Sequence, residues 1–344
     1  MSPRGLALMG ALTLALTACG SAAGSGADKQ LTVVMWGGDD QKKAVAAYVE
    51  PWAKGKSVTV KQDSPTDYAK FRAQVESKKV SWGVVEVEPN FAVTACKNGW
   101  AVKLSKVDTS AVKKELVGEC GIPVLEYAFT IGYNTKSFTA DNHPKSWAEF
   151  FDTKKFPGKR GFWKYATGAM FEAALLADGV PKDKLYPLDL DRAFKKLDTI
   201  KQDIVFYETG EQQQQLVSSG EVPLIQAWNG RVFAAAKDGQ PVANEWNEHL
   251  LSYDQLVIPA GYKGAALAEE WMNAFLADAK GQAAYTNQSA YAPVNPKALE
   301  FVQPDVRKEL PTEHEAQRAA IIDYTYWAEN YDKVTERMNA WMAG

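Results

Sequence analysis

Histidine is scarce in this chain of 344 residues, which contains only His143, His249 and His314. None of them has the spacing to Cys, His or carboxylate residues that is typical of a metal site. A Ser–His–Asp or Cys–His catalytic site would have to come from scattered residues, and the chain lacks a GxxxxGK phosphate loop. We therefore predict no metal, no cofactor and no enzymatic activity, and we interpret the three histidines as surface or capping residues.

Long hydrophobic runs are also missing after residue 18, so no later stretch approaches the length of a transmembrane helix. Residues 1–18 hold one cation, Arg4, followed by the apolar run Leu6–Leu16, which is typical of a secretory signal. The run ends in Leu-Thr-Ala-Cys19, which resembles the lipobox of bacterial lipoproteins. That resemblance implies cleavage before Cys19, lipidation of its thiol, and an exported chain anchored to the cell envelope membrane, facing the periplasm or the exterior. Residues 19–30 predict a flexible tether.

Cysteine is limited to three residues, and lipid on Cys19 leaves Cys96 and Cys120. Two thiols that remain in an oxidising compartment favour one disulfide. Two separate buried thiols are the alternative, because sequence does not give the separation of the two Cα atoms.

Charge of one sign does not dominate, since the formal net charge is −3. A weakly acidic chain gives no support for nucleic-acid binding. Apolar residues make up 46% of the chain and charged residues 24%, as in soluble globular proteins. The length allows two domains of ordinary size, and we expect a monomer.

Strand and helix patterns alternate along the first part of the chain. Predicted strands at 31–36, 57–61 and 83–87 alternate with predicted helices at 41–50, 67–77 and 89–97. Pro51 should end or kink the first of these helices. The βαβαβα pattern predicts a parallel sheet with helices on both faces.

A second α/β unit follows, in which we predict strands at 129–133, 161–164, 204–207, 222–228 and 255–258. We predict helices at 144–152, 167–178, 190–202, 210–219, 230–237, 265–276, 313–330 and 331–342. No linker separates the units, so the chain should cross between two lobes through strands. We assign 31–130 with 256–305 to the first lobe and 131–255 with 306–344 to the second. Ligand would bind in the cleft between them.

Several motifs, in this order, carry a family resemblance. They are Asn142–Trp147 with Lys155–Arg160, Leu185–Phe194, Ser219–Glu221 with Ala227–Arg231, Ile258–Gly261, and Tyr291–Ala298. Together they resemble the polyamine-type extracellular solute-binding proteins of ABC importers. The stretch Glu119–Gly121, with Cys96, resembles a branch that has a disulfide in its first lobe.

This resemblance implies a periplasmic-binding-protein-like fold of two α/β lobes, each a sheet flanked by helices, hinged by crossing strands. It implies a receptor that captures a small amine-bearing solute, such as putrescine or spermidine, and delivers it to an ABC permease in the inner membrane. A secreted hydrolase is the alternative from a different class. A ferric-ion binder is disfavoured, because the chain has no adjacent tyrosine pair.

An ammonium ligand requires carboxylates for charge and aromatic walls for its methylenes. Trp36 ends the first predicted strand, and the resemblance implies that it packs on ligand; a core tryptophan is the alternative. Glu88 follows the third strand and is either a ligand carboxylate or a solvated loop residue. The resemblance implies that Trp228 stacks on the ligand. It also implies that Asp254, expected just before a crossing strand, holds the ammonium group; a solvated turn residue is the alternative.

Arg231 has two interpretations. It could pair with a protein carboxylate at the cleft, or it could bind a ligand carboxylate, which a polyamine lacks. Family polyamine binders also use two acids at the start of a second-lobe helix, which are absent from 165–172, where Glu172 is shifted. A zwitterion such as 4-aminobutyrate is therefore the alternative ligand.

Overall fold

The computed structural model describes residues 29–344. The predicted signal segment, Cys19 and nearly all of the predicted tether lie outside the described residues. Within 29–344, no helix has both the length and the apolar character needed to cross a bilayer.

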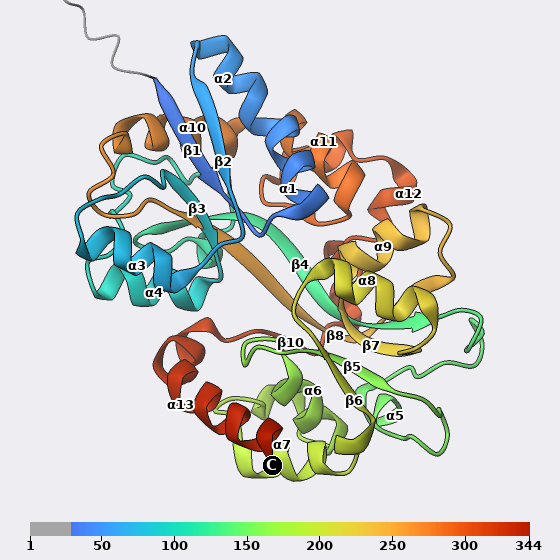
Figure 1. Cartoon of the computed structure of the whole chain (residues 1–344). Coiled ribbons are helices and arrows are strands. Elements are labelled where there is room, and N and C mark those ends of the chain that lie inside the picture. Colours follow the sequence, from blue (N-terminus) through green and yellow to red (C-terminus); the bar gives the residue numbers. More distant parts are fainter. Residues whose placement is uncertain (1–28) are drawn as a thin grey trace, which may run out of the picture.

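A single mixed sheet runs through the molecule in the order β2-β1-β3-β8-β4-β7-β5-β6 (Figure 1). Its strands are β1 (Gln30–Val34), β2 (Thr59–Asp63), β3 (Val84–Val87), β4 (Gly121–Asn134), β5 (Arg160–Trp163), β6 (Ile204–Tyr207), β7 (Leu224–Trp228) and β8 (Val242–Val257). Two short strands, β9 (Ala292–Pro293) and β10 (Ala320–Ile321), pair with β4 and β8.

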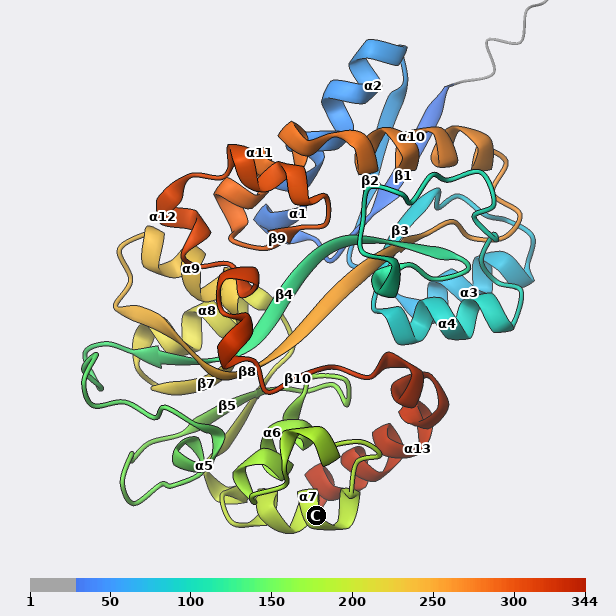
Figure 2. The same cartoon turned by 180° about the vertical axis from the view of Figure 1, so that it is seen from behind.

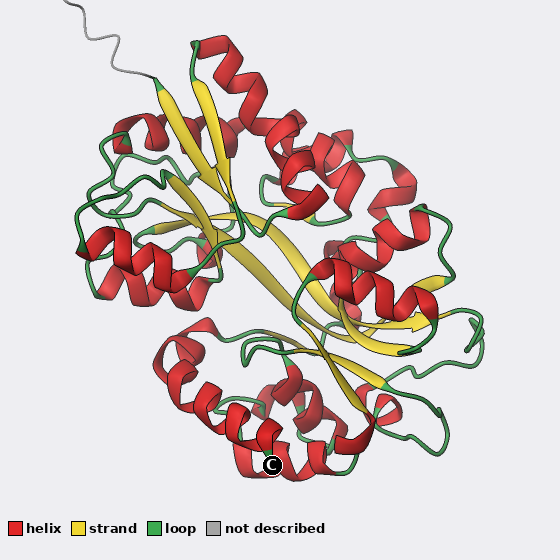
Figure 3. Ribbon diagram, viewed as in Figure 1, coloured by secondary structure: helices red, strands yellow, loops and turns green. Residues whose placement is uncertain are grey.

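The long antiparallel strands β4 and β8 join the two lobes (Figure 3). The first lobe contains parallel β2, β1 and β3, and β3 pairs with the end of β8. The second contains β5 parallel to both β6 and β7, and β7 pairs with the end of β4. Each long strand therefore passes from one lobe into the other, which confirms the predicted two-lobed fold with a hinge of crossing strands.

Helices cover both lobes (Figures 1 and 2). The first lobe has α1 (Gly38–Ala44), the π-helical segment η1 (Val45–Val49), α2 (Glu50–Lys56), α3 (Tyr68–Glu76), α4 (Pro89–Lys97), α10 (Ala265–Ala277) and α11 (Ala279–Ser289). The second has α5 (Trp147–Phe150), α6 (Met170–Ala177), α7 (Leu190–Asp198), α8 (Gly210–Ser219) and α9 (Asn229–Lys237). The short α12 (Pro304–Arg307) and the C-terminal α13 (Tyr324–Ala343) complete the set.

The first helix does not end at Pro51, where the sequence predicted either an end or a kink. Segments α1, η1 and α2 form one helix from Gly38 to Lys56. The π-helical turn lies immediately before the residue that precedes Pro51. A π turn changes the hydrogen-bond spacing where the proline N–H is missing, so the helix continues beyond it.

Other predictions were wrong in extent. Strands β4 and β8 have 14 and 16 residues and are much longer than predicted, and helix α11 was missed. The two helices predicted for 313–342 are instead short 3-10 turns, β10 and the single helix α13. Asp323 defines the start of α13, because its side chain accepts a hydrogen bond from the amide of Tyr326.

Two of the three histidines are buried, which corrects the surface part of their interpretation as surface or capping residues. The ring of His143 stacks on Tyr133, and its Nε2 atom lies 2.8 Å from Glu245. The Nδ1 atom of His249 lies 3.0 Å from the carbonyl oxygen of Trp246, and burial lowers the pKa of His249 to about 4. Both histidines therefore stabilise local packing.

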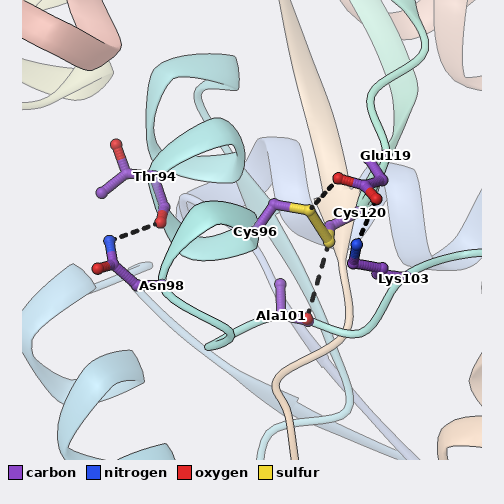
Figure 4. Close-up of a disulfide and its surroundings, with 7 residues drawn as sticks. All are labelled: Thr94, Cys96, Asn98, Ala101, Lys103, Glu119 and Cys120. Carbon is purple, nitrogen blue, oxygen red and sulfur yellow. Dashed lines mark hydrogen bonds and ion pairs between the residues drawn. A yellow bond between two sulfur atoms is a disulfide. The ribbon is translucent and has the colours of Figure 1, made fainter.

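The predicted disulfide is present in the first lobe (Figure 4). Cys96 lies in the last turn of α4 and Cys120 immediately precedes β4, with their Cα atoms 5.5 Å apart. The neighbouring Glu119 forms an ion pair with Lys103. The disulfide therefore ties the end of α4 to the start of a crossing strand.

Candidate ligand-binding site between the lobes

Strand ends of the first lobe and the adjoining part of the crossing strand β8 bring three of the predicted site residues together. Trp36 follows β1, Glu88 follows β3, and β8 carries Asp254 beside β3. The indole Nε1 of Trp36 donates a 2.7 Å hydrogen bond to Asp254, and Glu88 accepts one of 3.3 Å from the hydroxyl of Tyr68. The rings of Trp36 and Tyr68 meet edge to face, with centroids 6.3 Å apart. The prediction that Asp254 precedes the strand was wrong: it lies within β8.

The carboxyl groups of Glu86, Glu88 and Asp254 are all buried. Burial raises the pKa of Asp254 to about 8, and the charge of Glu88 adds to this effect. Burial also raises the pKa of Glu88 to about 7. The pKa of Glu86 is raised well above its ordinary value by burial and then by the charge of Asp254. A bound cation would favour the ionised forms of these acids.

Arg231 supplies positive charge from the second lobe. It lies in the first turn of α9, its side chain is 13% exposed, and its Nη1 atom is 3.2 Å from Glu211. Burial lowers its pKa, but Tyr291, Asp40 and Glu211 more than offset that effect, so the pKa of Arg231 is raised. Asp40 belongs to α1, so the electrostatic environment of Arg231 includes both lobes.

Trp228 takes part in an aromatic cluster of the second lobe. It ends β7, and its ring meets those of Trp163 and Tyr207 edge to face, with centroids 5.0 and 5.7 Å away. Within residues 29–344, no hydrogen bond or ring contact joins Trp228 to Trp36 or Asp254. The structure thus places Trp228 in the second lobe, immediately before the helix that carries Arg231.

Several buried polar atoms of these residues have no hydrogen-bond partner within the described chain. They are Glu88 Oε1 and Asn90 Oδ1 from the first lobe, Asp254 Oδ1 from the crossing strand β8, and Thr167 Oγ1 and Arg231 Nε from the second lobe. Buried polar groups are normally paired. The side chains of Thr167 and Glu88 face each other as hydrogen-bonding neighbours, so the lobes meet at this point and the two groups partly satisfy each other. The arrangement offers buried carboxyl groups and a buried guanidinium group to a small polar ligand.

Sequence reasoning left Glu86, Thr167 and Glu211 out of the candidate site. Glu86 carried a usable signal, because it is the single acid in the buried strand Val84–Val87. Thr167 and Glu211 lie in surroundings that look like ordinary helix starts, so only the approach of the two lobes identifies them.

Glu172, by contrast, has a structural role. Its Oε1 atom accepts hydrogen bonds from the hydroxyl of Tyr186 at 2.6 Å and from Nε1 of Trp327 at 2.9 Å. Glu172 therefore anchors α13 to α6. Burial raises the pKa of Glu172 to about 6, even though both hydrogen bonds favour its ionised form.

Two α/β lobes joined by crossing strands, with buried charges from both at their interface, define a receptor that encloses a small solute. Residues 27–312 match the family described as bacterial extracellular solute-binding protein. The chain belongs to this family and is a solute-binding protein of an ABC importer. Members of the family are exported receptors that deliver a small ligand to a permease.

Similar proteins cover almost the whole chain. The gamma-aminobutyric acid-binding protein of Pseudomonas aeruginosa is 32% identical over 333 residues, which are 94% of each chain. The solved structure of the Atu4243–GABA receptor is 41% identical, with a TM-score of 0.85, covering 91% of this chain and 97% of that one. The PBP AgtB of A. tumefaciens, in complex with agropinic acid, is 30% identical, with a TM-score of 0.83, covering 92% and 99%.

Proposed function

We propose that this protein binds a small ω-amino acid of the 4-aminobutyrate type in the cleft between its lobes. Asp254 and Glu88 receive the ammonium group, and Arg231 receives the carboxylate. The observation that carries the proposal is a pair of opposite buried charges: the carboxyl groups of Asp254 and Glu88 on one side of the cleft, and the guanidinium of Arg231 on the other. A zwitterion satisfies both ends, because each of its charges gains a charge-assisted hydrogen bond.

This proposal favours the zwitterion over a polyamine. A polyamine brings no anion for Arg231, whose buried guanidinium would repel a second ammonium group. The names of two relatives also support a gamma-aminobutyric acid ligand. Trp36 and Tyr68, which meet beside Asp254 and Glu88, supply an aromatic wall for the methylenes. Trp228 would extend this wall from the second lobe.

The anchor and the lobe boundaries are further proposals. We propose that Cys19 is lipidated and tethers the exported chain to the envelope membrane, and that the mature protein works as a monomer. We also propose 31–130 with 256–305, and 131–255 with 306–344, as the two lobes.

Calorimetric titration tests the ligand class. We expect 4-aminobutyrate to bind stoichiometrically and more tightly than 3-aminopropanoate, 5-aminopentanoate, putrescine or spermidine. Arg231→Ala should weaken 4-aminobutyrate at least about 30-fold, which corresponds to about 2 kcal/mol, the lower range for truncating a buried charge partner. Arg192→Ala is the matched control, because Arg192 pairs with Asp178 at the surface. Tighter binding of putrescine than of 4-aminobutyrate would overturn the proposal.

A further inference from the structure

Glu211 is a second-lobe residue whose carboxylate lies against the first lobe. It is the second residue of α8, and its Oε1 atom is 3.2 Å from Nη1 of Arg231. The same oxygen lies directly against Gly38, the first residue of α1, because a Cβ atom added at Gly38 would overlap with it. One carboxylate therefore contacts a charged residue of its own lobe and a helix start of the opposite lobe.

The start of α1 attracts this carboxylate. The helix continues unbroken to Lys56, so its peptide dipoles give the Gly38 end a partial positive charge. Two acids lie in the same turn, but Asp39 is exposed beside Lys42 and Lys43 and Asp40 accepts a hydrogen bond from Tyr285. These partners reduce the repulsion that Glu211 would meet.

Arg231 is held in place on two sides. Its side chain covers Gly210, where an added Cβ atom would overlap with the guanidinium, and Glu211 contacts its Nη1 atom. The Nε atom is buried and has no partner in the described chain. Gly210 and Glu211 thus fix the guanidinium from two directions, which orients it for a ligand carboxylate.

We infer that Glu211 is a positioning residue that couples closure of the lobes to recognition of the ligand carboxylate. In the closed protein its carboxylate joins the start of α1 to Arg231, and opening the lobes breaks only the contact with α1. Glycine at position 38 permits this contact, since any side chain there displaces Glu211. The inference rests on the proposed function, because the ligand carboxylate is the group that Arg231 receives.

Stopped-flow measurement of 4-aminobutyrate release tests the inference. Glu211→Ala should speed dissociation about tenfold. Glu208→Ala, a matched control at the same end of α8 whose residue pairs with Lys164 at the surface, should leave the rate unchanged. Gly38→Ala should also speed dissociation at least tenfold. When Gly38→Ala is added to Glu211→Ala, the rate should rise less than threefold above that of Glu211→Ala alone. Equal effects of Gly38→Ala with and without Glu211 would overturn the inference, as would an unchanged rate in Glu211→Ala.

A ligand-free measurement separates this inference from the proposed function. Spin labels at Lys54→Cys in α2 and Lys182→Cys in the second lobe report the distance between the lobes, since both positions are exposed. Glu211→Ala should shift the distance distribution of the unliganded protein towards the open form, whereas Glu208→Ala should not. Failure of the wild type to bind 4-aminobutyrate rejects the proposed function. An unchanged distance distribution in Glu211→Ala rejects the coupling by Glu211.

Discussion

The indole nitrogen of Trp36 donates a 2.7 Å hydrogen bond to a carboxylate oxygen of Asp254, although 218 residues separate them in the chain. This contact fixes one oxygen of Asp254 and leaves the other, Oδ1, without a partner in the described chain. The aromatic residue and the acid therefore act together: the tryptophan orients the carboxylate that would receive the ammonium group.

Trp36→Phe should weaken 4-aminobutyrate binding about tenfold, because it keeps an aromatic ring but removes a hydrogen bond to a charged group, of the order of 1.5 kcal/mol. Trp82→Phe is a matched control: its indole donates a 2.7 Å hydrogen bond to Asp63, which is not one of the predicted site residues. Calorimetry should show no change of affinity for that control. Equal affinity of Trp36→Phe and wild type would show that orientation of Asp254 by Trp36 is unimportant.

Ligand binding should release protons near neutral pH. Burial raises the pKa of Asp254 to about 8 and of Glu88 to about 7, so both are partly protonated without ligand at pH 6.5. An incoming ammonium group favours their ionised forms. Titrations at pH 6.5 in buffers of different ionisation enthalpy should reveal net proton release, and affinity should rise as pH rises towards 8. Identical binding enthalpies in all buffers would contradict this prediction.

The raised pKa of Asp254 also predicts how stability varies with pH. A carboxyl group whose pKa is higher in the folded state stabilises that state fully below its unfolded pKa, near 4, and this stabilisation disappears as pH rises through about 8. Between about pH 4 and pH 8, the free energy of unfolding falls by about 1.4 kcal/mol for each pH unit. Asp254→Asn should therefore melt at a higher temperature than wild type at pH 8, with a smaller difference at pH 5.

Thermal denaturation of the ligand-free proteins checks this result. Asp305→Asn is the control, because Asp305 is exposed and pairs only with Lys308 at the surface. The melting temperature of Asp305→Asn should change with pH from 5 to 8 in the same way as that of wild type. A constant difference between Asp254→Asn and wild type from pH 5 to 8 would contradict the prediction.

Removing the disulfide should destabilise the first lobe. Cys96 and Cys120 are 24 residues apart, and chain-entropy arguments give about 3 kcal/mol for a loop of this order. The double variant Cys96→Ala/Cys120→Ala should lose about this much free energy of unfolding in urea. Peptide mapping without reductant should detect the crosslink in wild type, and free thiols at both positions in freshly exported protein would exclude it.

Cys19→Ala should move the protein from the membrane fraction to the soluble fraction, because the predicted lipidation site is lost. Cell fractionation followed by a salt wash measures the change. Replacing the nearby tether residue Ser21 with Ala should leave the distribution unaltered. If Cys19→Ala stays with the membrane after the wash, another feature anchors the chain.

The sequence predicted those parts of the site that follow short strands. Trp36 and Glu88 come after apolar runs whose ends meet at one edge of a parallel sheet, so their proximity followed from the pattern. Strand β8 was largely missed, because Asn244, Glu245 and Asn247 interrupt its apolar alternation and pairing with β4 supplies its stability. The setting of Asp254 within a strand was lost with it.

The sequence did not predict the residues that contact each other across the lobes, for a different reason. Glu211 occupies the first turn of a helix, where an acid is ordinary, and Gly38 begins another helix far away in the chain. Neither position carries a local signal of its partner. Their contact depends on how the two lobes approach each other across the crossing strands, and no periodic pattern in the sequence indicates that distance.

The central place of β8 in the sheet has a consequence for the order in which the chain can fold. Its residues Gln255–Val257 pair with β3, which ends at Val87, and β3 has no other neighbour on that side. During synthesis from the N-terminus, the first lobe therefore stays incomplete until the second lobe's strands β5, β6 and β7 have emerged. Such distant pairing slows folding. A chain destined for export thus carries, in its topology, a built-in delay before its native structure can form.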